Sequence, residues 1–142
     1  MNIVIPENVG GGDVMLLPEG LARATLDRII LGTSQAGHPK ATFRYVVTEE
    51  MTEKTEDGSP TTGAIVLDTI SLQPQALFTL AGIYKQVTKE SLSSLQGNYS
   101  EEEFGALLNE RLCGTEWNLI LKREISLDGE PRTVIKKQTL IK

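Results

Sequence analysis

The spacing of apolar residues changes twice along this chain, and the order of these changes restricts its fold more than any other feature. Residues 21–31 (LARATLDRIIL) and 41–48 (ATFRYVVT) alternate apolar with polar side chains, and residues 63–72 (GAIVLDTISL) are rich in β-branched side chains. Both patterns are typical of β-strands. The chain then changes to helical spacing and later returns to strand patterns. We therefore predict three strands, a helical insert and two further strands.

The helical insert extends over about residues 75–112. Apolar side chains recur at helical spacing in residues 75–87, and a second helix is predicted over residues 101–112. This second helix has a clear start, because Ser100 is a good N-cap and Glu103 stands where a capping box requires it. Gly114 is placed to cap its end.

Two long strands, residues 115–127 and 132–141, are predicted after the insert. Asp128-Gly129 between them is the strongest short hairpin signal in the chain. Five strands with a helix between the third and the fourth is the chain order of the OB-fold, a small antiparallel barrel. We therefore predict a mainly β protein, in which residues 19–142 form one five-stranded OB-type barrel with a helical insert. Residues 1–18, which contain three consecutive glycines, are predicted to be a flexible N-terminal arm.

The composition argues against an ordinary enzyme. His38 and Cys113 are the only histidine and the only cysteine, so a zinc cluster and a histidine-activated nucleophile lack their usual partners. The segment GGGD, residues 10–13, lacks the Lys-Ser/Thr that completes a phosphate-binding loop. No apolar run approaches the roughly 20 residues of a membrane helix, and the N-terminus does not resemble a signal peptide. We predict a non-enzymatic cytoplasmic protein without metal or cofactor, not associated with a membrane.

Charge is distributed unevenly along the chain. The formal net charge of −5 by itself argues weakly against a nucleic-acid-binding protein. Residues 21–48, however, carry four basic groups against one acidic group, and residues 112–142 carry six against four. Five acidic groups against one basic group lie in residues 49–58, which are predicted to belong to a mobile loop. The predicted strands are thus net basic, and the acidic groups are concentrated elsewhere.

One stretch of the chain suggests a family. The segment TSQAGHPKATFRY, the acidic loop after it and the strand at residues 63–72 together resemble phage-encoded single-stranded DNA-binding proteins of OB type. The pattern of that family is a Ser/Thr-x-x-Gly-x-Pro turn between the first two strands, formed here by Ser34, Gly37 and Pro39. A leucine-rich helical insert and a late glycine-bounded hairpin also match, so the likeness covers everything after the N-terminal arm. The chain departs from the family at its end, KKQTLIK, where many members carry an acidic tail that recruits partners.

The resemblance implies a function and a set of partners. It implies binding of single-stranded DNA in replication or recombination, contacts with proteins of those processes, and the cytoplasm of a bacterial host as the place of action. Single strands are bound by cationic grooves with aromatic side chains on which bases stack. Basic and aromatic side chains on the predicted strands are therefore the candidate contacts.

The basic candidates form two groups. Lys40 and Arg44 lie at the first turn and on the second strand, and Arg132 lies just past the last hairpin. In OB-folds these two loops flank the ligand-binding face, so the three residues are the leading candidates for phosphate contacts. The remaining basic candidates are Arg23, Lys122, Lys136 and Lys137.

The aromatic candidates have two interpretations. Phe43, Tyr45 and Trp117 are the candidates for stacking on bases, but each alternates with polar neighbours, so the same pattern also fits side chains packed in the core. Tyr84 and Tyr99 flank the helical insert and are further candidates for stacking, but Tyr84 shares the apolar helical stripe, so we expect it to be buried.

Two other functions fit the composition. A protein-interaction or virion-structural β-domain without nucleic-acid binding would suit the acidic net charge, the few aromatic residues and the apolar insert. An oligosaccharide-binding OB module has less support, because exposed aromatic residues are few. The sequence leaves open the preference for DNA or RNA and the oligomeric state, a homo-oligomer included.

Overall fold

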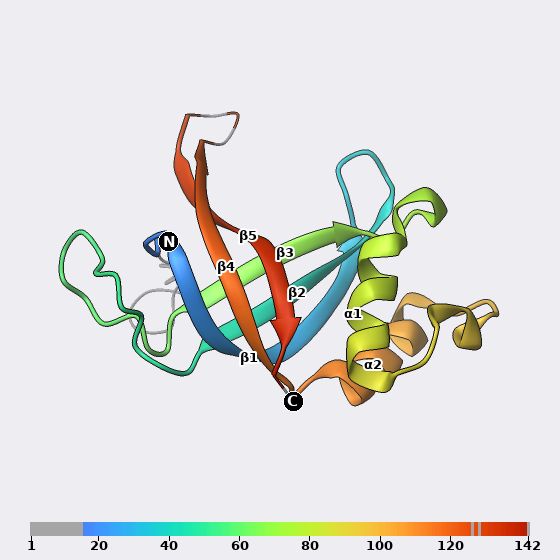
Figure 1. Ribbon diagram of the computed structural model, residues 1–142. Coiled ribbons are helices and arrows are strands. Elements are labelled where there is room, and N and C mark those ends of the chain that lie inside the picture. Colours follow the sequence, from blue (N-terminus) through green and yellow to red (C-terminus); the bar gives the residue numbers. More distant parts are fainter. Residues whose placement is uncertain (1–15, 126, 128, 142) are drawn as a thin grey trace, which may run out of the picture.

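Five antiparallel strands form one sheet in the order β3-β2-β1-β4-β5 (Figure 1). The computed structural model describes residues 16–125, 127 and 129–141. The strands are β1 (Gly20–Thr33), β2 (Pro39–Val47), β3 (Ile65–Ser71), β4 (Glu116–Ile125) and β5 (Pro131–Leu140). All five begin and end within two residues of the predicted bounds, because turn residues interrupt the alternating pattern between them.

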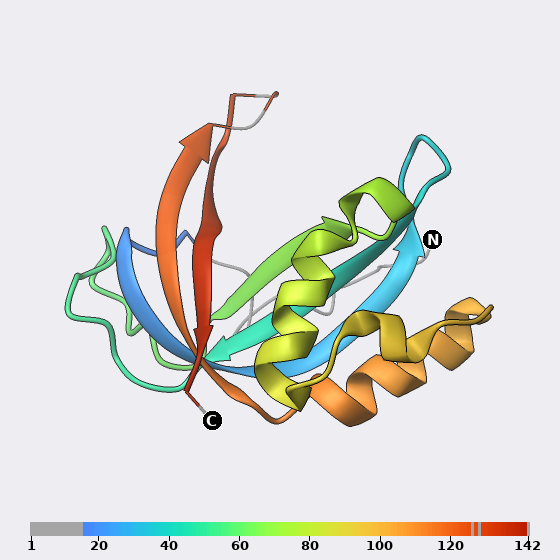
Figure 2. The ribbon, with the colours of Figure 1, turned by 45° about the vertical axis from the view of Figure 1, so that its right-hand side comes forward.

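The sheet is strongly curved but does not close on itself (Figures 1 and 2). β3 and β5 are its two edges, and in the described part of the chain they are not paired with each other. A cleft of about 440 Å³ lies between them, lined by residues of both strands. The mainly β architecture with a helical insert is therefore confirmed, whereas the closed barrel is not.

The insert between β3 and β4 contains two helices, α1 (Phe78–Thr88) and α2 (Glu101–Leu112), with short 3₁₀ turns at Pro74–Ala76 and Leu92–Leu95. The predicted start of the first helix at residue 75 is three residues too early, because the segment after Gln73 forms a separate 3₁₀ turn. None of the helices in the described residues is long and apolar enough to span a membrane.

The ends of α2 follow from its sequence. The predicted capping box is present, since the Glu103 backbone N–H donates to Ser100 Oγ (3.1 Å) and the Ser100 N–H donates to a Glu103 carboxylate oxygen (3.2 Å). The helix ends with Cys113 as its C-cap, so the predicted cap, Gly114, lies one residue beyond the observed cap. Gly114 has a φ of 89°, which glycine adopts without the strain of a side chain, and its N–H bonds to the carbonyl of Leu26 (2.8 Å).

The core lies between the inner face of the sheet and the two helices (Figure 2). Leu26 and Leu119 from the sheet and Leu80 and Leu108 from the helices are fully buried there. Tyr84 on α1 is also fully buried, as its place in the apolar stripe predicts, and its hydroxyl accepts a hydrogen bond from Arg111 (2.6 Å). Burying these apolar surfaces is the main contribution to the stability of such a fold.

β1 changes its neighbour halfway along its length, and α2 takes the place of the strand that leaves. β1 pairs with β4 only as far as Thr25, and its register with β2 shifts between Leu26 and Arg28. Beyond this bulge the side-chain amide of Asn109 on α2 acts like a neighbouring strand. Its Nδ2 donates to the Ile29 carbonyl (2.8 Å), and its Oδ1 accepts from the Ile29 N–H (3.0 Å). The free edge of β1 is thereby paired with a helix.

The loop between β2 and β3 is anchored rather than mobile as predicted. Met51 and Thr61 are buried, and the Met51 N–H donates to Thr61 Oγ1 (2.7 Å). The Glu50 carboxylate accepts the backbone N–H groups of Thr61 (2.9 Å) and Thr62 (3.1 Å). These hydrogen bonds favour the charged form and lower the pKa of Glu50 to about 2.

Glu50 should therefore make stability pH-dependent in acid. Its pKa is lower in the folded than in the unfolded chain, so its stabilising effect is complete above the unfolded pKa and lost as pH falls towards 2. We expect Glu50→Gln to have a lower thermal midpoint than the parent at pH 6, with the difference shrinking between pH 4.5 and pH 2.5. Thermal unfolding followed by circular dichroism measures this, with Glu53→Gln in the same loop as the matched control. A constant difference across that pH range would contradict the role of the carboxylate.

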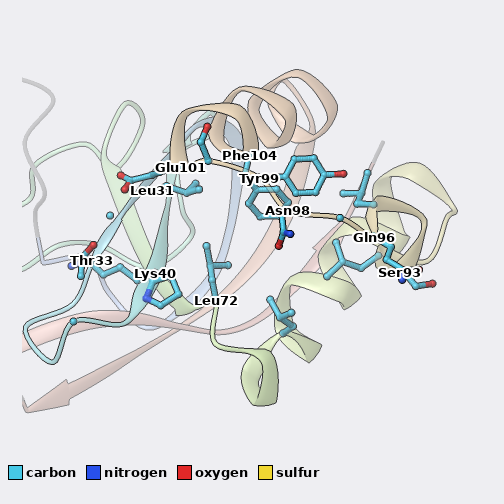
Figure 3. Close-up of a pocket in the computed structure, with 18 residues that line it drawn as sticks. Leu31, Thr33, Lys40, Leu72, Ser93, Gln96, Asn98, Tyr99, Glu101 and Phe104 are labelled. Atoms are coloured by element: carbon cyan, nitrogen blue, oxygen red, sulfur yellow. The ribbon is translucent and has the colours of Figure 1, made fainter.

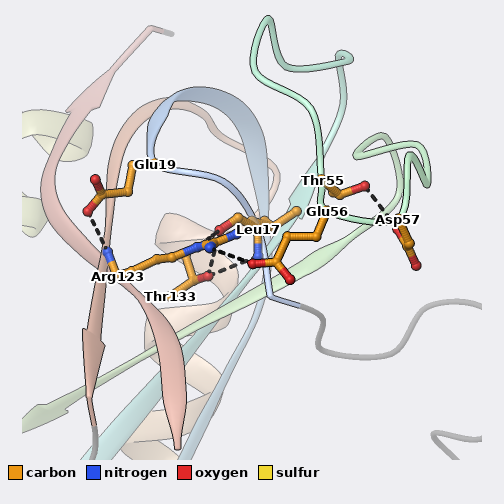
Figure 4. A network of polar contacts seen from close by, with 7 residues as sticks. All are labelled: Leu17, Glu19, Thr55, Glu56, Asp57, Arg123 and Thr133. Carbon is orange, nitrogen blue, oxygen red and sulfur yellow. Dashed lines mark hydrogen bonds and ion pairs between the residues drawn. The ribbon is translucent and has the colours of Figure 1, made fainter.

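The segment before β1 is tied to the folded body at Leu17 (Figure 4). The Leu17 N–H donates to Thr133 Oγ1 (2.9 Å), and its carbonyl accepts from Thr133 (3.1 Å) and from Arg123 Nε (3.2 Å). Arg123 also pairs with Glu56 at 3.1 Å. Of the predicted N-terminal arm, residues 1–15 lie outside the described residues, and Leu17 belongs to the core.

Candidate nucleic-acid interface

The outer face of β1, β2 and β3 carries two of the three leading candidates for phosphate contacts, Lys40 and Arg44. Three rows cross these strands, as the register shows. Arg28, Arg44 and Leu67 form one row, Ile30, Thr42 and Thr69 the next, and Gly32, Lys40 and Ser71 the third. The hydroxyls of Thr42 and Thr69 are 3.1 Å apart. We refer to these nine residues as the outer face. Because neighbouring residues of a strand point to opposite sides, the outer face is separate from the core.

Two arginines stand directly opposite each other on this face. Arg28 and Arg44 are cross-strand partners, and like charges in this position destabilise a sheet. Asp27 compensates in part, since its carboxylate lies 3.4 Å from Arg44. Neither Arg28 nor Lys40 has an ion pair among the described residues. Three cations thus face solvent against one carboxylate, and an anion bound between them would relieve their repulsion.

Arg28 was not identified from the sequence as a candidate phosphate contact. Alternation counted from Ala22, Ala24 and Leu26 places residue 28 on the inner face, but the bulge after Leu26 reverses the order, so Ile29 is buried and Arg28 is exposed. Two adjacent charged residues, Asp27 and Arg28, in an otherwise alternating strand were the available signal of a bulge.

The other predicted cations are dispersed or already paired. Arg23 pairs with Glu49 (3.1 Å) and with Glu116 (3.5 Å). Arg132 and Lys136 share the carboxylate of Glu124, at 3.8 and 3.1 Å. Such exposed pairs contribute little to stability, but their carboxylates neutralise part of the positive charge on the surface of the sheet. Two candidates on the β4–β5 hairpin have no ion pair among the described residues, and these are Lys122 and Lys137.

Arg132 is separated from Lys40 and Arg44. It lines the cleft between the edges of β5 and β3, opposite Leu67 and Thr69. Asp68 lines the same cleft, and burial raises the pKa of its carboxyl. The structure thus brings Lys40 and Arg44 together on one face and places Arg132 across the cleft beyond β3.

The predicted stacking residues belong to the core. Phe43, Tyr45 and Trp117 are fully buried, and the rings of Tyr45 and Trp117 meet edge to face at 6.5 Å between centroids. The Trp117 indole N–H donates to Thr115 Oγ1 (2.8 Å). The core interpretation of these aromatics is therefore confirmed, and in this structure none of the three is accessible to a base.

Accessible aromatic rings occur instead in the helical insert. Tyr99 is 39% exposed, and the centroid of its ring lies 5.4 Å from that of Phe104. Both rings line a pocket of about 760 Å³ between the insert and the ends of β1, β2 and β3 (Figure 3). Phe78, 75% exposed on α1, does not line this pocket.

Comparisons of the chain with protein-family models and with curated proteins find no match.

Proposed function

We propose that this protein is a non-enzymatic single-stranded DNA-binding protein of OB type, acting in phage replication or recombination in the cytoplasm of a bacterial host. The observation that carries the proposal is the cross-strand pair Arg28 and Arg44, with Lys40 farther along the same face. The sheet order and the position of the insert between β3 and β4 are consistent with an OB-fold in which β3 and β5 complete the barrel.

The position of the outer face supports this assignment. In OB-folds the ligand lies across the second and third strands, between the first and the last hairpin loops. Here the β1–β2 turn and the adjoining ends of β4 and β5 all lie towards the top of both views (Figures 1 and 2). Outside the cations this face carries three hydroxyls, one glycine and the exposed apolar side chains of Ile30 and Leu67. It holds no amide or carboxylate side chain, which suits backbone contacts better than reading of base edges.

The test is binding of labelled oligonucleotides. We expect a dT oligomer to bind more tightly than a duplex of equal length, with little preference over a mixed sequence. Three phosphate contacts, each adding about 0.7 to the salt slope, predict an affinity loss of roughly 20-fold between 50 and 200 mM salt. Fluorescence polarisation measures each of these values. If the dT oligomer shows no polarisation change at 50 mM salt and protein concentrations well above micromolar, the proposal is wrong.

A protein-interaction domain is the alternative function. It is favoured by a pair of exposed apolar side chains, Leu21 on β1 and Ile120 on β4, which are cross-strand partners. These side chains are separate from the three cations. In that function, mutation of Leu21 would affect partner binding and mutation of Arg28 would not.

A further inference from the structure

The pocket beside Tyr99 and Phe104, which we call the insert pocket, is larger than the cleft between β3 and β5. Its volume of about 760 Å³ lies within the roughly 300–1,000 Å³ of small-molecule sites. Figure 3 shows Lys40 from β2, Leu72 from the end of β3, and Tyr99 and Phe104 from the insert around the same space. Three segments distant in sequence therefore build the site.

The lining of the insert pocket suits a flat ring with polar edges. Leucine side chains and the two aromatic rings supply its apolar surface. Asn98 and Gln96 add side-chain amides, and among the described residues neither amide has a hydrogen-bond partner. One cation, Lys40, and one carboxylate, Glu101, also line it. Because these two charges balance, the pocket suits a ligand with a neutral ring better than it suits a cluster of phosphates.

Lys40 connects the insert pocket to the outer face. It stands in the row of Gly32 and Ser71, and its side chain lies over Gly32, where an added Cβ would be 3.8 Å from Lys40 Cε. A strand whose phosphates contact Arg28 and Arg44 would therefore pass the mouth of the pocket at Lys40. Every nucleobase has a flat face that stacks on aromatic side chains.

We infer that the insert pocket receives one unstacked nucleobase of the bound strand, with Tyr99 as the stacking platform and Lys40 on the adjoining phosphate. This inference rests on the proposed function. It extends that function by assigning part of the binding affinity to base stacking on Tyr99, a residue outside the β-sheet. The amides of Asn98 and Gln96 contact the edge of the base.

The test compares three variants with a dT oligomer and with an abasic oligomer of the same length. Tyr99→Ala should weaken dT binding roughly 5- to 100-fold and leave the salt slope unchanged, because no phosphate contact is lost. Tyr99→Trp should retain affinity, and its new indole emission should be quenched by dT, whereas the buried Trp117 contributes a constant background. Phe78→Ala is the matched control, an exposed aromatic outside the pocket, and should bind like the parent.

The abasic oligomer separates the base from the backbone. The parent should bind it more weakly than dT, and Tyr99→Ala should bind both with similar affinity. If the parent binds dT but Tyr99→Ala binds it equally well and Tyr99→Trp shows no quenching, the pocket is not a base site and the proposed function stands. If the parent binds neither oligomer at low salt, the proposed function itself fails.

Discussion

Replacing Arg28, Lys40 and Arg44 together by alanine is expected to weaken binding of a dT oligomer about 100-fold at 0.1 M salt. Each phosphate contact on a single strand adds about 0.7 to the salt slope, which corresponds to roughly fivefold in affinity at this salt concentration. The slope itself should fall by about 2. Asp27, which loses its partner Arg44, would add to the effect by leaving an unpaired negative charge beside the strand.

Stability provides the internal control for this variant. Removing two like charges that face each other across β1 and β2 should leave the thermal midpoint unchanged or raise it slightly. A matched variant removes three cations elsewhere, Lys54, Lys85 and Lys89, and thus changes the net charge equally. If both triple variants lose the same affinity, binding depends on overall charge and the outer face is not the site.

Local sequence signals were sufficient for the elements of this fold. Ser100 and Glu103 defined the start of α2, and turn residues separated the strands, because these signals depend on backbone groups within a few residues. The predicted start of α1 was three residues too early, since a 3₁₀ turn and an α-helix share similar apolar spacing.

The candidate site depended on contacts that a linear pattern does not record. Alternation shows that Phe43 and Arg44 point to opposite sides of β2, but not which side the helices cover. The insert pocket was not predicted, because Tyr99 lies in an irregular segment and meets Leu72 and Lys40 only through the tertiary fold. The bulge at Arg28 depends on the departure of β4 and on the side chain of Asn109, both distant in sequence.

Asn109→Leu is expected to cost about 2–4 kcal/mol of folding stability, although it exchanges a polar side chain for an apolar one of similar size. Asn109 makes hydrogen bonds with both backbone groups of Ile29, a residue that is 3% exposed. Leucine would leave a buried N–H and a buried carbonyl without partners, at about 1–3 kcal/mol each. Chemical denaturation measures the change directly, and in thermal unfolding it should appear as a fall of roughly 10 °C.

Two further substitutions separate hydrogen bonding from helix propensity and packing. Glu110→Ala, at the next and exposed position of α2, should change stability by less than about 0.5 kcal/mol. Asn109→Asp keeps the acceptor for the Ile29 N–H but turns a carboxylate oxygen towards the carbonyls of Ile29 and Gly105, which Asn109 Nδ2 now contacts at 2.8 and 2.7 Å. Protonation of the introduced carboxyl restores a donor, so this variant should lose less stability relative to the parent at pH 4 than at pH 7. Surface substitutions usually change the free energy of unfolding by no more than about 0.5 kcal/mol. If Asn109→Leu changes it by no more than that, the backbone groups of Ile29 do not depend on α2 for their hydrogen bonds. The account of how the helix completes the edge of β1 would then be wrong.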